Sequence, residues 1–235
     1  MVNICGVSMK IDCHCHTIYS KHWFWGYDSI NTPEEMIKAA IKKGLDGLAI
    51  TDHNTVKGSL VGKKIAKKYK NFIIITGSEI RTISGEVLGL KIKEDVPMNL
   101  SLEETIEKIH DLGGIASIPH PFGKYFFKKP GIKNPLNADA IEVYNSKLRN
   151  SSNKKALELA KKFKRAITAG SDAHSVKTVG NAGIICNDDP IEDILKKRVK
   201  IFGKRTSLID MTNLIAKKFL RSIEWRISRK RGKHI

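Results

Sequence analysis

Residues 31–55, NTPEEMIKAAIKKGLDGLAITDHNT, contain one complete helix–strand unit and predict the fold class of the chain. Thr32 is a suitable N-cap, and Glu35, three residues later, completes a capping box. Pro33 fits the first helical turn, and Gly44 is typical of the residue that ends a helix. The apolar run that follows predicts a strand that ends in the polar sequence TDH. This unit indicates an α/β protein in which polar side chains follow the strands.

The same alternation of helix and strand continues along the chain. Helices are predicted at about residues 58–70, 101–114, 153–163 and 190–198, and strands at about residues 72–80, 115–122, 138–146, 166–174 and 181–187. Short connections between alternating strands and helices predict a parallel sheet, and this number of units favours a barrel over an open sheet. A chain of 235 residues is long enough for one such domain, which we expect at residues 1–205.

The segment IDCHCHTIYSKH, residues 11–22, holds three of the eight histidines of the chain. Side chains alternate between the two faces of a strand, so Asp12, His14 and His16 are expected on one face and the intervening cysteines on the other. In a half-buried strand with scattered polar residues, the two neighbouring imidazoles would need separate partners and would repel each other when protonated. A shared cation removes both problems. A metal site is therefore our preferred interpretation, and the half-buried strand is the alternative.

Other metal-ligating residue types follow the later predicted strands. Because the carboxyl ends of barrel strands converge on one face, we expect these side chains to meet there. They are too many for one tetrahedral ion with its four or so ligands, and they suit two or three ions that share bridging oxygens. Imidazoles mixed with carboxylates favour zinc, manganese or iron over a calcium or purely magnesium site. The candidates are His14, His16, His22, His53, Glu79, His120, Asp172 and His174.

Six short motifs in one order resemble the PHP family, the polymerase and histidinol phosphatase domain. They are DCHCHT followed by His22, ITDHNT, GSEI, IPHPF, IEVYN, and GSDAHS followed by GNA, and together they span about residues 9–185. The resemblance implies a distorted seven-stranded (β/α) barrel, similar to a TIM barrel, with a trinuclear metal centre at the carboxyl end of the strands. It also implies phosphoesterase activity, in which a metal-activated hydroxide attacks the phosphate.

The resemblance also implies a role for each ligand. The first metal is expected on His14, His16, Glu79 and Asp172, the second on Glu79 and His120, and the third on His22, His53 and His174. Many members of the family carry a further histidine between the bridging glutamate and the H-P strand, where this chain has only His110, at the end of a predicted helix. Glu86 occupies the place where related sequences often carry that histidine, and it is a candidate oxygen ligand.

Further residues are candidates for supporting roles. Asp12 and Asp52 adjoin ligand histidines, and we expect them to orient imidazoles through the second ring nitrogen, with ligation as the alternative. Glu142 and Asn145 are candidates for second-layer or substrate contact. Asp172 is the candidate proton acceptor, and Glu79 shares the catalytic assignment as the bridging ligand. The candidate phosphate-binding residues are Arg81, Lys124, Asn145, Lys147 and Arg149.

The charge of the chain favours anionic partners, because 42 Lys and Arg against 24 Asp and Glu give a formal net charge of +18. A generally lysine-rich surface is the alternative. The four cysteines lack the spacing of a secreted scaffold, and no apolar signal core or membrane span is visible, so we expect a cytoplasmic protein.

Residues 206–235 are expected to form a basic amphipathic helix or tail. Ala216, Leu220, Ile223 and Ile227 lie on one helical stripe. We prefer packing of this stripe on the barrel over a dedicated nucleic-acid or membrane arm.

The expected function is hydrolysis of a phosphomonoester or nucleotide with two to three divalent transition-metal ions. One alternative is a nuclease that trims short RNA or DNA from an end, which the positive charge and the aromatic segment Trp23–Trp25 would serve. Another is a non-catalytic RNA-binding subunit. Such a subunit would be expected to lose ligands, and the nearly complete ligand set therefore favours an enzyme.

Overall fold

The computed structural model describes residues 8–21, 28–123, 134–135 and 137–230. It confirms the α/β class, with helices around a single nine-stranded sheet in the order β7-β6-β5-β4-β3-β2-β1-β8-β9. The strands are β1 (Met9–Cys15), β2 (Gly47–Ile50), β3 (Ile73–Arg81), β4 (Glu86–Leu90), β5 (Ile115–Ile118), β6 (Ala140–Asn145), β7 (Ala166–Gly170), β8 (Ala182–Cys186) and β9 (Lys200–Gly203). The helices are α1 (Pro33–Lys42), α2 (Lys57–Ala66), α3 (Leu102–Asp111), α4 (Asn150–Lys162), α5 (Pro190–Leu195) and α6 (Leu208–Lys230).

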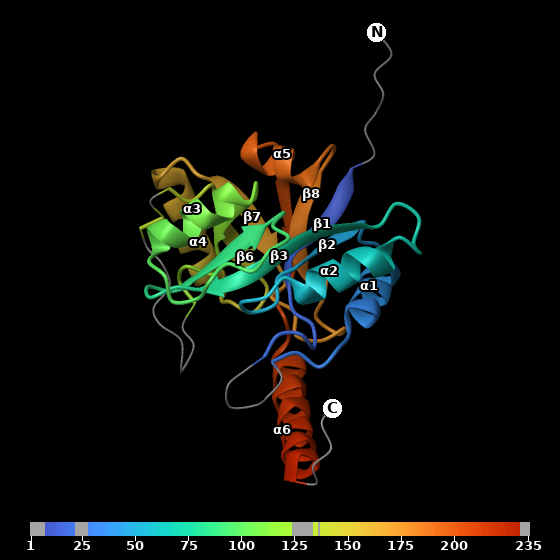
Figure 1. Cartoon of the computed structure of the whole chain (residues 1–235). Coiled ribbons are helices and arrows are strands. Elements are labelled where there is room, and N and C mark those ends of the chain that lie inside the picture. The colour runs from blue at the N-terminus through green and yellow to red at the C-terminus, as the bar shows by residue number, and fades with distance from the viewer. Residues whose placement is uncertain (1–7, 22–27, 124–133, 136, 231–235) are drawn as a thin grey trace.

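The sheet curls into a nearly closed barrel, because the edge strand β7 packs beside β1 and β8. Helices α1 and α2 lie on one side of the barrel, and α3 and α4 lie on the other (Figure 1). We expected seven strands, but the described residues form nine, because β8 and β9 extend the sheet beyond β1. This arrangement brings the first and seventh strands together.

The prediction of a parallel sheet is wrong for part of the barrel. β1–β2, β2–β3, β5–β6 and β6–β7 are parallel pairs, but β4 is antiparallel to both neighbours and β8 is antiparallel to β1 and β9. Between β3 and β4 the chain has only four residues, and Thr82 N donates to Gly85 O at 2.7 Å to close the turn. A connection this short permits only an antiparallel pair, because a parallel pair needs a crossover. The hairpin places the end of β3 beside the start of β4.

Two helices begin as their sequences predict. In α1, Glu35 N donates to Thr32 Oγ1 and the Glu35 side chain accepts from the Thr32 backbone, which forms the predicted capping box. In α3, Ser101 and Glu104 make the same reciprocal pair. Substituting such an N-cap by alanine costs about 1 kcal/mol. Both caps fix the start of a helix that covers the barrel.

The core is apolar and surrounds the barrel strands. Cys13 packs in the cluster around Ile11, and Cys15 packs in another cluster around Met36, so both thiols are buried away from solvent. They are free cysteines, as is Cys186. The alternation of residues along β1 therefore divides this strand as predicted, with cysteines in the apolar core and histidines elsewhere.

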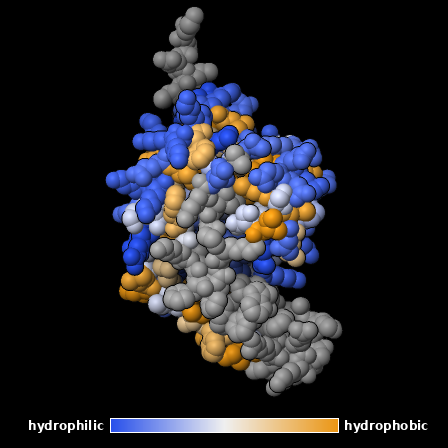
Figure 2. Space-filling model, turned by 90° about the vertical axis from the view of Figure 1, so that its left-hand side faces the viewer, coloured by the Kyte–Doolittle hydropathy of each residue, from blue (hydrophilic) through white to orange (hydrophobic). Residues whose placement is uncertain are grey.

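Helix α6 extends away from the barrel, on the side opposite α5 (Figure 1). The expected helix is present, but its predicted packing is wrong: Leu220 is 61% exposed and Ile223 is 39% exposed. Figure 2 shows hydrophobic side chains near the base of the molecule, where α6 begins. Lys218 and Arg221 of this helix instead contact residues 28–30, the segment that precedes α1. No helix in the described ranges has the length and apolar character needed to cross a membrane.

Candidate metal centre

His14 and His16 direct their rings to the same point at the end of β1. Their Nε2 atoms lie 3.1 Å apart, and both residues are fully buried. The second ring nitrogen of His14, Nδ1, lies 2.9 Å from Glu142 Oε1. The other oxygen of Glu142 accepts from the backbone N of His120 at 2.8 Å and from Asn145 Nδ2 at 3.0 Å. Glu142 therefore holds His14 in one orientation and leaves its Nε2 facing His16.

The Glu79 carboxylate lies at the centre of the histidines. Its Oε2 atom is 3.1 Å from His53 Nδ1 and 3.3 Å from His16 Nε2. The same oxygen is 3.4 Å from His14 Nε2, and Oε1 is 2.9 Å from His120 Nε2. These imidazoles come from the ends of β1, β2 and β5, while Glu79 belongs to β3. One carboxylate thus faces four imidazoles from three different strand ends.

Asp172 is held beside this group by an unusual backbone conformation. It follows β7 with φ of 52°, and its backbone N donates to His14 O at 2.8 Å. Its Oδ1 atom lies 3.5 Å from His16 Nε2 and 2.9 Å from Lys147 Nζ. Burial alone would raise the pKa of Asp172, but Lys147 and His14 hold it well below its usual value. Positive φ also occurs at His120, and such strained residues cluster at functional sites.

Asp28 is a member of the cluster that the sequence did not predict. Its Oδ2 atom lies 2.7 Å from His174 Nε2 and 3.1 Å from His53 Nε2. Its Oδ1 atom lies 2.6 Å from the Nζ atom of Lys218, on α6. Asp28 follows no predicted strand, so the rule that found the other residues could not find it. The only hint of Asp28 in the sequence was the presence of a carboxylate between the first histidine motif and the Thr32 N-cap.

Asp12 and Asp52 do not orient imidazoles as expected. Asp12 Oδ1 accepts from the backbone N of Ser171 at 2.9 Å, and its Oδ2 accepts from Gly180 N at 2.8 Å. Asp52 accepts from the backbone N of Thr17 at 2.5 Å and from its hydroxyl at 2.7 Å. Both carboxylates join loops to the strand ends, because the backbone N–H groups there need acceptors.

The remaining predicted residues divide into four kinds. Glu86 starts β4, with its carboxylate 3.9 Å from both His53 Nδ1 and His120 Nε2, so it lies at the edge of the cluster. Arg81 and Arg149 are exposed, and their role as phosphate-binding residues stays a prediction. His110 pairs with Asp139 at 2.8 Å, outside the cluster. The predicted residues His22 and Lys124 and the segment Trp23–Trp25 lie outside the described residues.

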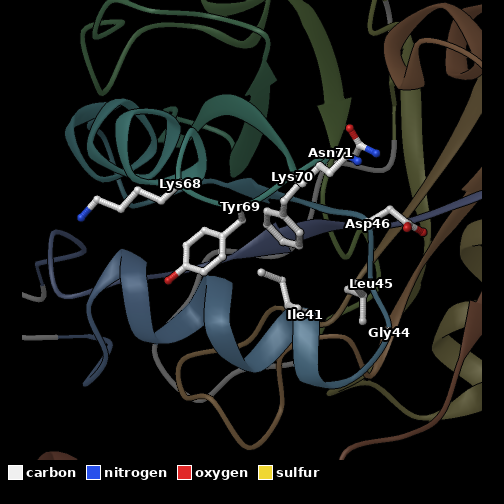
Figure 3. Close-up of a pocket in the computed structure, with 9 residues that line it drawn as sticks. Ile41, Gly44, Leu45, Asp46, Lys68, Tyr69, Lys70 and Asn71 are labelled. Carbon is white, nitrogen blue, oxygen red and sulfur yellow. The ribbon is translucent and has the colours of Figure 1, made fainter.

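A surface groove lies at the opposite end of the strands. It has a volume of about 590 Å³ and is formed where the chain enters β2 and β3 (Figure 3). Its lining residues are Ile41, Gly44, Leu45, Asp46, Lys68, Tyr69, Lys70, Asn71 and Phe72. The groove contains none of the histidines described above, and it is therefore separate from the candidate metal centre.

The architecture and this cluster agree with one known family. A family model described as the PHP domain matches residues 12–213 of the chain. The chain belongs to the PHP family. An uncharacterised protein of Methanocaldococcus jannaschii, MJ0417, is 37% identical over 192 residues, which cover 78% of this PHP chain and 73% of that protein. A Caldicellulosiruptor bescii protein named as a probable phosphatase is 28% identical, with coverage of 83% of this chain and 94% of that protein.

A solved structure supports the fold of this PHP protein. It comes from Bifidobacterium adolescentis and belongs to a protein assigned as a metal-dependent phosphoesterase. The two structures have a TM-score of 0.63 at 17% sequence identity, with coverage of 85% of this chain and 98% of that chain. At this identity the similarity establishes the shared barrel architecture.

The side chains of the PHP centre fit divalent metal ions. In each of four overlapping groups, one possible ligand atom per residue lies within 4.8 Å of the others. Burial lowers the pKa of His174 well below its usual value, an effect that Asp28 opposes and that Lys147 and Lys218 reinforce. This keeps the imidazole in the neutral form that binds metals. The four groups are His16, Asp28, His53 and His174; His14, Glu79 and His120; His14, His16 and Asp172; and His53, Glu79 and Glu86.

Proposed function

We propose that this PHP protein is a metal-dependent phosphoesterase that hydrolyses a phosphomonoester or nucleotide. The observation that carries the proposal is the position of Glu79, whose two carboxylate oxygens face imidazoles from three different strand ends. A carboxylate shared in this way suits a bridge between neighbouring cations, which is the arrangement that two-metal hydrolases use. The family membership and the relative named as a phosphatase support the same reaction class.

Two to three divalent ions, such as zinc, manganese or iron, would be held by the described residues. Bound there, they supply a nucleophilic hydroxide at neutral pH and stabilise the charge of the phosphoryl group. The proposed ligands are His14, His16, Asp28, His53, Glu79, His120, Asp172 and His174, with Glu86 at the edge and His22 completing the set expected from the sequence.

The residues around the ligands have their own tasks. Asp172 is our candidate for the proton acceptor, since its carboxylate lies beside the centre, with Oδ1 3.5 Å from His16 Nε2. Asn145 donates to both Glu142 and Asp172, at 3.0 and 3.4 Å, and so fixes the two carboxylates relative to each other. Because Glu142 in turn holds His14, these hydrogen bonds preorganise one side of the centre.

The test combines metal analysis with hydrolysis. Protein purified without added metal is examined by elemental analysis and then incubated with a series of phosphomonoesters and phosphodiesters, before and after chelation. We expect two to three transition-metal ions per chain and turnover that chelation abolishes and metal restores. Protein that hydrolyses none of these esters after loading with manganese or zinc would refute the proposal.

A nuclease is the second candidate, because the net charge of +18 favours a polyanionic substrate. Short RNA and DNA substrates in the same series distinguish the two enzymes. Shortening from one end, with a steep loss of rate at higher salt, would favour the nuclease. Salt-sensitive binding of RNA without any hydrolysis would instead favour the non-catalytic subunit.

A further inference from the structure

Helix α6 reaches the candidate centre with one basic side chain. Lys218 Nζ lies 2.6 Å from Asp28 Oδ1, and the Lys218 side chain is only 16% exposed. Three residues further along the helix, Arg221 Nη1 donates to the backbone O of Ile30 at 2.6 Å. These two contacts anchor α6 on the segment that contains Asp28, whose carboxylate also contacts His53 and His174. The helix that follows the barrel therefore contributes a cation to the same site.

A second lysine lies on the other side of His174. Lys147 Nζ is 2.8 Å from His174 Nδ1 and 2.9 Å from Asp172 Oδ1. His174 connects the two ammonium groups, because Lys147 contacts its Nδ1 atom and Asp28, the partner of Lys218, lies 2.7 Å from its Nε2 atom. Each lysine side chain is only 16% exposed. Two such charges are stable together only where anions compensate them.

The carboxylates that compensate these lysines also face the imidazoles of the centre. Asp28 lies between Lys218 and the histidines His53 and His174, and Asp172 lies between Lys147 and His16. Metal ions bound by the imidazoles would be neutralised by these same carboxylates, which would leave less negative charge to compensate the lysines. Each ammonium has three N–H donors, and the described contacts use one donor of Lys218 and two of Lys147. Both lysines then have charge and donors for an anionic ligand.

We propose that Lys147 and Lys218 together bind the phosphate of a phosphomonoester. This inference rests on the proposed phosphoesterase function and narrows its substrate. Two ammonium groups match the two negative charges of a terminal phosphate, whereas the internal phosphate of a diester carries one. Each lysine forms charge-assisted hydrogen bonds with the phosphate oxygens, which are among the strongest hydrogen bonds in proteins. Helix α6 is accordingly part of the substrate site, and a barrel without it lacks half of the pair.

The first experiment measures binding of inorganic phosphate to the metal-loaded, full-length protein by titration calorimetry. Lys218→Met keeps most of the side-chain stem and removes the charge, and Lys217→Met, at the exposed neighbouring position, is the matched control. We expect Lys218→Met to weaken phosphate binding at least tenfold, Lys218→Arg to retain most of it, and Lys217→Met to match the wild type. Lys147→Met should resemble Lys218→Met. Equal affinity in the Lys217→Met and Lys218→Met variants would overturn the proposal.

Two further measurements make the result specific. Elemental analysis should give the same ion content in Lys218→Met as in the control. A selective loss of metal would overturn the proposal, because Lys218 would then support the ion site through Asp28. In active protein, kcat/KM for phosphomonoesters should fall more than kcat/KM for diesters. Phosphate binding needs no turnover, so a protein that binds phosphate through Lys218 and hydrolyses no ester would refute the proposed function alone.

Discussion

The Nε2 atoms of His14 and His16 lie 3.1 Å apart, and both residues are fully buried. Burial opposes the charged form of His14, but Glu142, Glu79 and Asp172 raise its pKa well above the usual value. Without a metal ion, these two nitrogens form a hydrogen bond only when one of them carries a proton. A divalent ion at this point would instead accept a lone pair from each imidazole and would serve as their common partner.

Chelation should destabilise the wild-type protein. An ion at 100 times its Kd stabilises the folded state by about 2.7 kcal/mol, which corresponds to about 5–10 °C in Tm for a chain of this size. His14→Ala should lose most of this response, whereas His110→Ala should keep it, because His110 is paired with Asp139 outside the cluster. Thermal melts with and without chelator measure the effect. An equal response in the wild type and the His14 variant would exclude His14 as a ligand.

Asp28→Asn should reduce metal binding at one part of the centre. The substitution keeps the size of the side chain and removes the charge that faces His53 and His174. We expect about one ion per chain to be lost, while the ions near Glu79 remain. Elemental analysis measures this, with Asp111→Asn, at an exposed position on α3, as the control. Unchanged ion content in Asp28→Asn would show that Asp28 is not a ligand.

Glu142→Gln should weaken metal binding without removing a ligand. The glutamine can present an oxygen to either His14 or the backbone N of His120, but its amide nitrogen must then face the other donor. Changes behind a ligand histidine typically reduce metal affinity by about 10–100-fold. Competition with a chromophoric chelator measures the affinity. An affinity within twofold of the wild type would contradict the role of Glu142 in orienting His14.

Gly170→Ala should disturb both stability and metal content. A Cβ atom at residue 170 would collide with His14 Cβ and come within 2.8 Å of His14 N, in the middle of the barrel. Gly62→Ala is the comparison. Its Cβ would crowd the flexible end of Ile50 and make an ordinary contact with Pro33 Cβ, and alanine favours a helix by about 1 kcal/mol over glycine. We expect lower Tm and fewer bound ions only for the variant at residue 170. Similar melting and ion content in both variants would disprove this close packing against β1.

Asp12→Asn should lower stability and leave the ions in place. Asp12 accepts hydrogen bonds from Ser171 and Gly180, and an asparagine amide would leave one of these buried donors unsatisfied, at a cost of about 1–3 kcal/mol. Chemical denaturation and elemental analysis, applied to the same preparation, separate the two effects. A loss of metal at unchanged stability would assign Asp12 to the centre after all.

Local sequence patterns predicted the elements and most of the cluster. The capping residues Thr32 and Ser101 and the polar residues at strand ends act over a few positions, so the sequence reveals them directly. Asp28 was missed because no local pattern places it: Ser29 Oγ donates to His16 O at 2.9 Å and to His174 O at 3.1 Å, and these tertiary contacts bring its neighbour Asp28 into the cluster.

The orientation of α6 also could not be predicted from the sequence. Its stripe at Leu220 and Ile223 predicted packing on the barrel, but the contacts of Lys218 and Arg221 with residues 28–30 turn that stripe outward. Helical periodicity identifies an apolar face, but it does not predict which face of the helix will pack against the rest of the protein. The same limit applies to β4, whose direction follows from the tight turn at Thr82 and Gly85.

The contacts of Ser29 also constrain when the protein can fold during synthesis. Ser29 joins the end of β1 to the residues after β7, and β1 itself pairs with β8 as well as β2, so the first strand lacks one of its two neighbours until β8 has left the ribosome. Contacts of such large sequence separation form slowly, and the incomplete chain exposes unpaired strand edges meanwhile. The imidazoles of the first histidine motif therefore stay apart from Asp172 and His174 in the nascent chain. The complete cluster of imidazoles and carboxylates consequently forms late in the biogenesis of this protein, after β7 and β8 have closed on β1.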